Sequence, residues 1–104
     1  MAAKDPRLSH PTLRILGLFL ETPRQQLAGT DICKRLDLLS GTSYPILMRL
    51  DRAGWIESEW EQVDPRKIGR PRKRLYRLTA LGYNKSREAL NGLRVPDGRP
   101  AWTW

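Results

Sequence analysis

The chain has 104 residues, of which 39% are hydrophobic and 29% are charged. Such a composition excludes a disordered chain, and the length suits one domain with a modest core. The longest apolar stretch, Ile15 to Leu20, is far shorter than the roughly 18–20 residues that cross a bilayer. The first residues lack the apolar region of a secretory signal. We therefore expect a cytoplasmic protein without a membrane partner.

The first half of the chain predicts three helices separated by short loops. The first spans Thr12 to Glu21 and follows Ser9-His10-Pro11, where Ser9 or His10 stands near the cap and the proline opens the first turn. Thr30 is the expected cap of a short second helix, Asp31 to Leu36. The third helix runs from Thr42 to Ala53 and ends at a glycine.

Apolar side chains cover nearly the whole circumference of the first predicted helix. A surface helix shows a single apolar stripe, so this helix needs a second surface that buries it. Two arrangements satisfy this need. Either the rest of the chain covers the helix, or the helix contacts a second subunit.

The second half of the chain changes to the two-residue period of β-strands. From Trp55 to Glu61, positions 56, 58 and 60 share one face and glutamates occupy the other, which predicts a half-exposed strand. Lys73 to Leu78 predicts a second strand, and Gln62 to Arg72 joins the two as a long protruding loop. Thr79 is the expected cap of a last helix, Ala80 to Leu93.

This order of elements predicts a mainly α protein with a small β-hairpin. The fold is a winged helix-turn-helix with the order helix, helix, helix, strand, wing, strand, helix. We assign residues 1–93 to the winged-helix domain, with its last helix as a dimerisation helix, and residues 94–104 to a flexible tail.

Cysteine and histidine each occur once, at Cys33 and His10. A structural zinc site needs several such ligands, so the sequence predicts no metal and no cofactor. Cys33 lies among apolar residues of a predicted helix and is expected to act as a small buried hydrophobic residue, with a redox or intermolecular role as the alternative. Neither residue has the neighbours that nucleophilic catalysis needs, and no phosphate-binding glycine motif is present. We therefore predict that the protein is not an enzyme.

The net charge of +8 is concentrated in one segment. Seven cationic side chains and no acidic one fall between Arg66 and Arg77, directly after an acidic run from Glu57 to Asp64. A local cationic excess favours a polyanionic partner. Beside a helix-turn-helix pattern, that partner is predicted to be double-stranded DNA.

The third predicted helix presents hydroxyl groups at its start. A recognition helix places its N-terminal residues at base edges in the major groove, and backbone N–H groups there also suit phosphate oxygens. The candidate DNA contacts of this helix are Ser40, Thr42, Ser43, Tyr44 and Arg49. The alternatives are that Ser40 or Thr42 only caps the helix and that Arg49 is merely solvated.

The basic loop is the more specific feature. Gly-Arg-Pro flanked by cations predicts a narrow finger that fits a minor groove, where narrow A·T-rich stretches attract arginine. The candidate contacts here are Arg70, Arg72, Lys73 and Arg74. The alternative is a solvated basic loop without a partner.

The sequence resembles the PadR family of winged-helix transcriptional regulators over Leu8 to Leu93. Three motifs carry the resemblance: Gly41-Thr42-Ser43-Tyr44-Pro45, Ala53-Gly54-Trp55-Ile56, and Tyr76-Arg77-Leu78-Thr79-Ala80-Leu81-Gly82. Their order and spacing are typical of the family. Ser43 stands where an aliphatic residue is more usual in the family.

The resemblance implies a homodimeric repressor that binds a palindromic operator. With only one helix after the wing, the dimer contact is expected on the first and last helices, through Leu13, Leu16, Leu20, Tyr83, Leu90 and Leu93. Whether a small aromatic effector binds stays open. Trp55, Trp60, Trp102 and Trp104 are the side chains that would stack on one, although core packing for the first two is the simpler interpretation.

Two other functions remain as alternatives. A winged helix can serve as a protein-interaction module, which predicts little affinity for duplex DNA and leaves the basic wing unexplained. A nonspecific nucleic-acid binder would keep the dependence on salt and lose the preference for one sequence.

Overall fold

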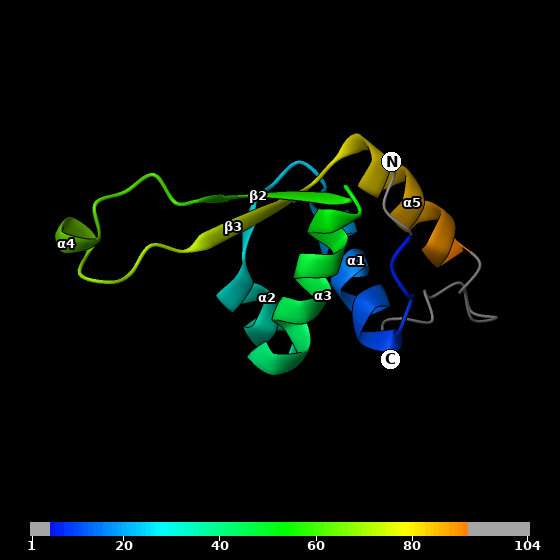
Figure 1. Cartoon of the computed structure of the whole chain (residues 1–104), viewed down its shortest axis with the longest axis horizontal. Helices are drawn as coiled ribbons and strands as arrows, with labels where there is room; N and C mark the ends of the chain where they lie inside the picture. The colour runs from blue at the N-terminus through cyan, green and yellow to red at the C-terminus, as the bar shows by residue number, and fades with distance from the viewer. Residues whose placement is uncertain (1–4, 92–104) are drawn as a thin grey trace.

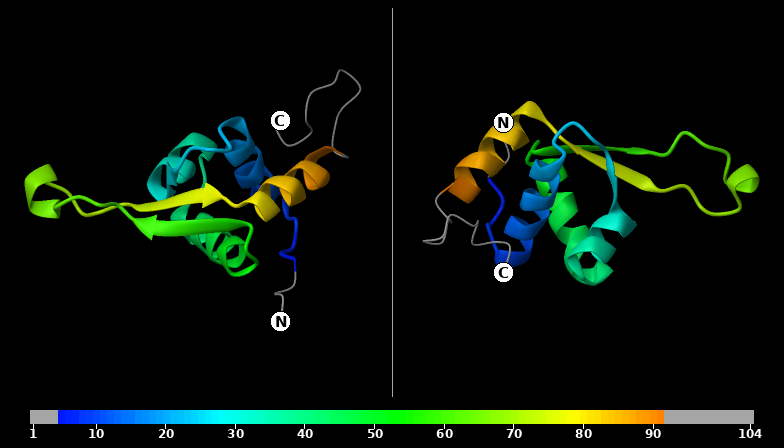
Figure 2. Two further views of the ribbon diagram at one scale, coloured as in Figure 1. Left: turned by 90° about the horizontal axis from the view of Figure 1, so that it is seen from above. Right: turned by 180° about the vertical axis from the view of Figure 1, so that it is seen from behind.

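The computed structural model describes residues 5–91, and it confirms the winged helix-turn-helix (Figure 1). In chain order the elements are α1 (His10–Glu21), β1 (Leu27–Ala28), α2 (Gly29–Leu36), α3 (Ser40–Arg52), β2 (Ile56–Trp60), α4 (Pro65–Ile68), β3 (Arg74–Leu78) and α5 (Ala80–Asn91). The hairpin of β2 and β3 projects beyond the helices, and α5 lies at the opposite end of the molecule (Figure 2). Within the described range no helix is both long and apolar enough to cross a membrane.

Helix α1 occupies the centre of the core. Ile15, Leu16 and Phe19 are at most 1% exposed, and α2, α3 and α5 all pack against the helix. On α5, the small buried Ser86 accompanies the buried Leu90. The chain therefore covers its own first helix, which is the first of the two arrangements that the sequence allowed.

The ends of the helices follow the predicted signals only in part. Ser9 caps α1 as predicted: its Oγ accepts a hydrogen bond from the Thr12 backbone N–H at 3.4 Å, so the helix begins at His10. The prediction that Thr30 caps α2 is wrong, because Ala28 is the N-cap residue and no side chain bonds there. The cap of α3 is likewise Leu39, which excludes Ser40 and Thr42 as caps of that helix.

The short strand β1 was not predicted. Its two residues pair with β3, Leu27 opposite Tyr76 and Ala28 opposite Leu75, so β3 is the middle strand of the order β1-β3-β2. Two residues are too few to show the alternation by which a strand is recognised in a sequence. The pairing ties the loop before α2 to the wing strand.

In strands β2 and β3 the side chains predicted to be buried are buried near the helices, but the outermost one is exposed. Ile56, Tyr76 and Leu78 are buried on the face toward the helices. Trp60 shares this face but is 55% exposed, so its predicted place in the core is wrong. The hairpin of β2 and β3 extends outward beyond α2 and α3 (Figure 1).

The wing ends in one helical turn where the sequence predicted only a loop. Asp64 caps this turn, because its Oδ1 accepts a hydrogen bond from the Arg66 N–H at 2.9 Å. Pro65 occupies the first position, and Gly69 ends the turn in the left-handed region with φ 70°. The tip of the wing is therefore an ordered α4.

The turn from β3 into α5 gives structural roles to Thr79 and Gly82, two residues of the motif Tyr76 to Gly82. Thr79 caps α5 as predicted, since its Oγ1 accepts from the Gly82 N–H at 3.0 Å, and its hydroxyl donates to the Gly54 carbonyl. Gly82 packs directly on the chain at Trp55, where a Cβ would lie 1.7 Å from the Trp55 carbonyl oxygen. The predicted end of this helix at Leu93 and the predicted tail lie outside the described residues.

Replacing Gly82 by alanine is expected to destabilise the protein strongly. The new Cβ would overlap backbone atoms of Trp55, and overpacking of this severity lowers the free energy of unfolding by about 2 kcal/mol or more. Gly41→Ala is the matched control, because a Cβ on this helical glycine meets nothing within 4 Å. Urea denaturation should show the first change and little or a stabilising change for the control. Equal stability of the two variants would contradict the close approach of α5 to Trp55.

Candidate nucleic-acid interface

The side of α3 that faces away from the core is the first part of the interface. One stripe of the helix is buried: Ser43, Ile46, Leu47 and Leu50. The opposite stripe, which we call the outer face of α3, is exposed and consists of Gly41, Pro45, Met48 and Arg52. Positions three or four residues apart share one side of a helix. The outer face is therefore continuous and suits a partner that accepts a whole helix, such as a major groove.

Most of the predicted contacts of α3 are accessible. Ser40, Thr42 and Arg49 are exposed. Tyr44 is half-buried, and its ring lies against the start of α2, where a Cβ on Gly29 would be 2.9 Å from the Tyr44 hydroxyl oxygen. Burial, and to a lesser degree the charge of Cys33, raises the pKa of the Tyr44 phenol. The hydroxyl thus keeps its proton and can donate to a phosphate oxygen.

Ser43 is not available as a DNA contact. Its side chain is 0% exposed, and its Oγ is buried without a hydrogen-bond partner. The helix turns it into the core because it is three and four residues from the buried Ile46 and Leu47. This corrects the prediction from the sequence and explains why the PadR pattern usually has an aliphatic residue here.

A carboxylate fastens the two arms of the wing together. Both Glu61 carboxylate oxygens accept hydrogen bonds from the Arg70 guanidinium, at 2.7 and 2.9 Å. Glu61 also accepts from the backbone N–H of Lys73 at 3.2 Å. The Arg70 hydrogen bond is the largest cause that lowers the pKa of the Glu61 carboxyl from 4.5 to about 2. We call this arrangement the Glu61 clasp, and it is formed at every physiological pH.

The remaining wing cations are exposed or half-exposed. Arg66 and Lys67 stand on α4 at the tip, and Arg72 donates from Nε to the Val63 carbonyl at 2.7 Å. Lys73 is half-buried at the start of β3. None of these four takes part in an ion pair within residues 5–91, so their charges are free to meet phosphates.

Arg74, like Arg70, is engaged in contacts within the protein. Its guanidinium lies 5.1 Å from the centre of the Trp60 ring and donates to the Ser58 Oγ at 2.9 Å. Ser58 in turn donates to the Asp51 carboxylate of α3 at 2.7 Å. Trp60, Ser58 and Asp51 were not among the predicted DNA contacts, since only the strand register brings them to Arg74.

The predicted dimer residues fall into three groups. Leu16 and Leu90 are buried in the core of the single chain, at 0% and 6% exposure, so neither offers a surface to a second subunit. Leu13 and Leu20 are half-buried, and Tyr83 is 37% exposed. Leu93 lies outside the described residues. Only Leu13, Leu20 and Tyr83 therefore remain available for a contact with a second subunit.

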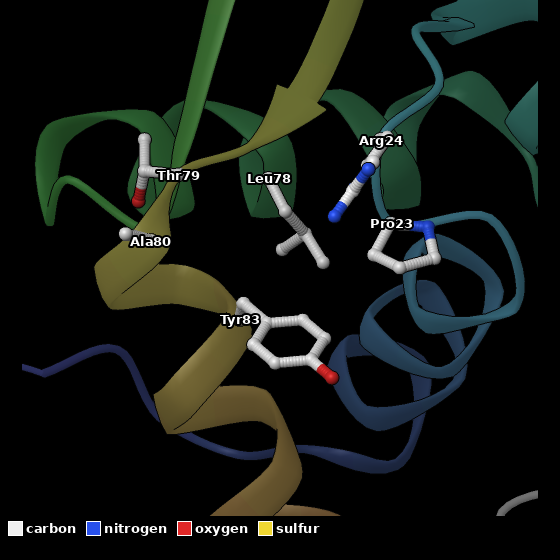
Figure 3. Close-up of a pocket in the computed structure, with 6 residues that line it drawn as sticks. All are labelled: Pro23, Arg24, Leu78, Thr79, Ala80 and Tyr83. Carbon is white, nitrogen blue, oxygen red and sulfur yellow. The ribbon is translucent and has the colours of Figure 1, made fainter.

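An open pocket of about 470 Å³ lies between the end of α1 and the start of α5. Its lining residues are Pro23, Arg24, Leu78, Thr79, Ala80 and Tyr83. The Arg24 guanidinium and the Tyr83 ring both border the same space (Figure 3). Neither Trp55 nor Trp60 lines it, because Trp55 is in the core and Trp60 is on the wing.

Residues 18–88 of the chain match the transcriptional regulator PadR-like family. The protein belongs to this family. Its members are transcriptional regulators, and the chain is accordingly a DNA-binding transcriptional regulator. No curated protein matches the chain.

Solved structures share the fold. A PadR family transcription regulator from Clostridium difficile is 20% identical, with a TM-score of 0.66 over 81% of this chain and 86% of that one. A PadR family regulator from Eggerthella lenta is 27% identical, with a TM-score of 0.61 over 78% and 70% of the two chains. Reduced AbfR bound to DNA is 26% identical, with a TM-score of 0.64 over 86% of this chain and 62% of AbfR.

Replacing Ser43 by alanine is expected to stabilise the protein without weakening DNA binding. A buried hydroxyl without a partner costs about 1 kcal/mol or more, and alanine removes it. Thr42→Ala is the control for stability, because it removes a hydroxyl at the neighbouring position that is exposed and not buried. Urea denaturation measures the stability and fluorescence anisotropy the affinity for duplex DNA. A loss of affinity in a stable Ser43→Ala variant would restore Ser43 as a contact.

Protonating Glu61 is expected to open the clasp. Because the folded-state pKa is lowered, the clasp contributes fully above about pH 4.5 and is lost as the pH falls toward 2. An NMR titration of the Glu61 carboxyl carbon should have its midpoint near 2 in the wild type. Arg70→Gln should return the midpoint toward 4.5, whereas Arg72→Gln should not. A wild-type midpoint near 4.5 would mean that the clasp is absent in solution.

Proposed function

We propose that this regulator is a dimeric, sequence-specific repressor that places α3 in the major groove and its wing in the minor groove of a palindromic operator. The observation that carries the proposal is the combination of an uncovered outer face on α3 with the wing cations Arg72 and Lys73, which form no ion pair within residues 5–91. A helix fits the major groove, and arginine in an extended finger suits the negative potential of a narrow minor groove. AbfR, a similar protein, has been solved bound to DNA.

On α3, the proposed contacts are Ser40, Thr42, Tyr44 and Arg49. The two aliphatic hydroxyls stand at the start of the helix, where backbone N–H groups also favour phosphate. Tyr44 is held by its packing against Gly29, so its hydroxyl has a fixed direction. Arg49 lies about two and a half helical turns after Ser40 and reaches the DNA backbone.

On the wing, the proposed contacts are Arg70, Arg72 and Lys73. Arg70 keeps a role although it is in the clasp: a guanidinium has five N–H donors, and three hydrogen bonds leave two donors for DNA. The clasp holds the wing in one shape before binding. A preformed wing loses less conformational entropy on binding than a loose loop would.

We propose a symmetric homodimer that uses the exposed apolar surface of α5. Tyr83 and Leu81 are 37% and 48% exposed, and the half-buried Leu13 and Leu20 of α1 complete the surface. A two-fold axis then repeats the DNA contacts on two half-sites, roughly 10 base pairs apart. The pocket beside Tyr83, with Arg24 at its edge, suits a small aromatic effector. The repressor works in the cytoplasm, where its operator lies.

A fluorescence-anisotropy titration tests the proposal. Labelled duplex from the upstream region of the gene should bind about a thousandfold more tightly than a scrambled duplex of equal length. Tyr44→Phe should reduce this ratio. Arg72→Ala should lower the slope of log affinity against log salt by about 0.9, whereas Arg77→Ala is the control because Arg77 pairs with Glu57.

The other outcomes assign other functions. Equal and steeply salt-dependent affinity for all duplexes, including tiled fragments of the whole upstream region, would identify a nonspecific nucleic-acid binder. Absence of binding to any duplex would favour a protein-interaction module. A monomer at micromolar concentration, measured by analytical ultracentrifugation, would contradict the dimer.

A further inference from the structure

We propose that Trp60, with Arg74 held on its ring, contacts the sugar–phosphate backbone of duplex DNA at the base of the wing. This inference rests on the proposed function and adds to it a contact that carries no base preference. Trp60 is the largest apolar side chain exposed on the wing, at 55%, while Trp55 at the other end of the same strand is 2% exposed. Tryptophan is seldom left so open in a folded domain.

The strand register places the Trp60 ring on the side of the sheet that carries α3. Ile56 pairs with Leu78 and Trp60 pairs with Arg74, and both pairs lie on the same face because they are four pairs apart along the ladder, an even number. Between them, Ser58 donates to Asp51 of α3, which shows that this face looks toward the recognition helix. Trp60 is the next residue outward on this face. It therefore borders the space between α3 and the wing.

The charge around Trp60 complements a phosphate backbone. Arg74 lies 5.1 Å from the centre of the ring and takes part in none of the ion pairs of residues 5–91. Lys73, its neighbour in sequence, adds a second unpaired cation. A flat apolar ring can pack on deoxyribose while its indole N–H and the adjacent guanidinium donate to phosphate oxygens.

The same residues fix the contact relative to α3. Asp51 accepts from Ser58 at 2.7 Å, and Ser58 accepts from Arg74 at 2.9 Å. This chain of hydrogen bonds joins the last turn of α3 to the strand that carries Arg74. The base of the wing and the recognition helix thus meet DNA as one rigid unit, and Trp60 lies at the junction.

Quenching of tryptophan fluorescence tests the contact directly. In a Trp102→Phe, Trp104→Phe background, the emitting residues are the buried Trp55 and the exposed Trp60. Acrylamide should quench the free protein, and a saturating operator duplex should lower the quenching constant at least twofold. Trp60→Phe in the same background should abolish this protection, because the remaining Trp55 is already shielded.

Affinity measurements separate the ring from the charges. Trp60→Ala should weaken binding about five- to tenfold on operator and scrambled duplexes alike, with an unchanged salt slope, because the indole carries no charge. Trp60→Phe should recover part of the loss. Leu8→Ala, which removes another exposed apolar side chain before α1, should have no effect. The melting temperature of each variant shows that it is folded.

Three results would overturn the inference. If the wild type binds DNA but its quenching is unchanged and Trp60→Ala stays within twofold, the backbone contact is wrong and the proposed function stands. If the wild type binds no duplex, both fail together. If protection of Trp60 rises with protein concentration in the absence of DNA, a second copy of the chain covers the ring instead.

Discussion

The burial of the apolar side chains of α1 against three other helices is the constraint on which the rest of the structure depends. Ile15, Leu16 and Phe19 leave almost no surface to water, and burying side chains of this size contributes about 1.5–3 kcal/mol each. No single neighbour can cover a whole helix, so α2, α3 and α5 all pack against it. Because α3 must give one stripe to this core, its opposite stripe is left to solvent. The outer face of α3 is thus a consequence of how α1 is covered.

The wing follows from a second constraint, the pairing of unlike charges between its strands. Glu57 faces Arg77 across the ladder and Glu61 holds Arg70, so the acidic and basic runs that are separate in the sequence meet in the structure. These pairs are exposed and contribute little to stability. Their effect is to select which cations stay unpaired. Arg72 and Lys73 are left without an ion pair within residues 5–91, and they are proposed to reach DNA together with the ion-paired Arg70.

The candidate site could be predicted as a region but not residue by residue. Ser40, Thr42 and Tyr44 were predicted because hydroxyls at the start of a helix are visible in the sequence, and their contact with DNA stays a proposal. Ser43 belongs to the same motif and was wrong, because its place three and four residues before the buried Ile46 and Leu47 turns it into the core. Leu16 was wrong for a related reason: apolar periodicity shows that a side chain is buried, not whether its own chain or a second one buries it.

The sequence by itself determined the order of the four main helices and the two hairpin strands, the basic wing and the membership of the PadR-like family, which the match over residues 18–88 confirms. Those features are encoded locally, in caps, periodicity and motifs of a few residues. Only the tertiary structure decided the pairing of β1 with β3, the exposure of Trp60 and the internal hydrogen bond of Arg74. Each of these depends on strand register and on how far the helices extend under the sheet. Strand register and the extent of the helices under the sheet depend on contacts between residues that are distant in the chain, so no local sequence pattern predicts them.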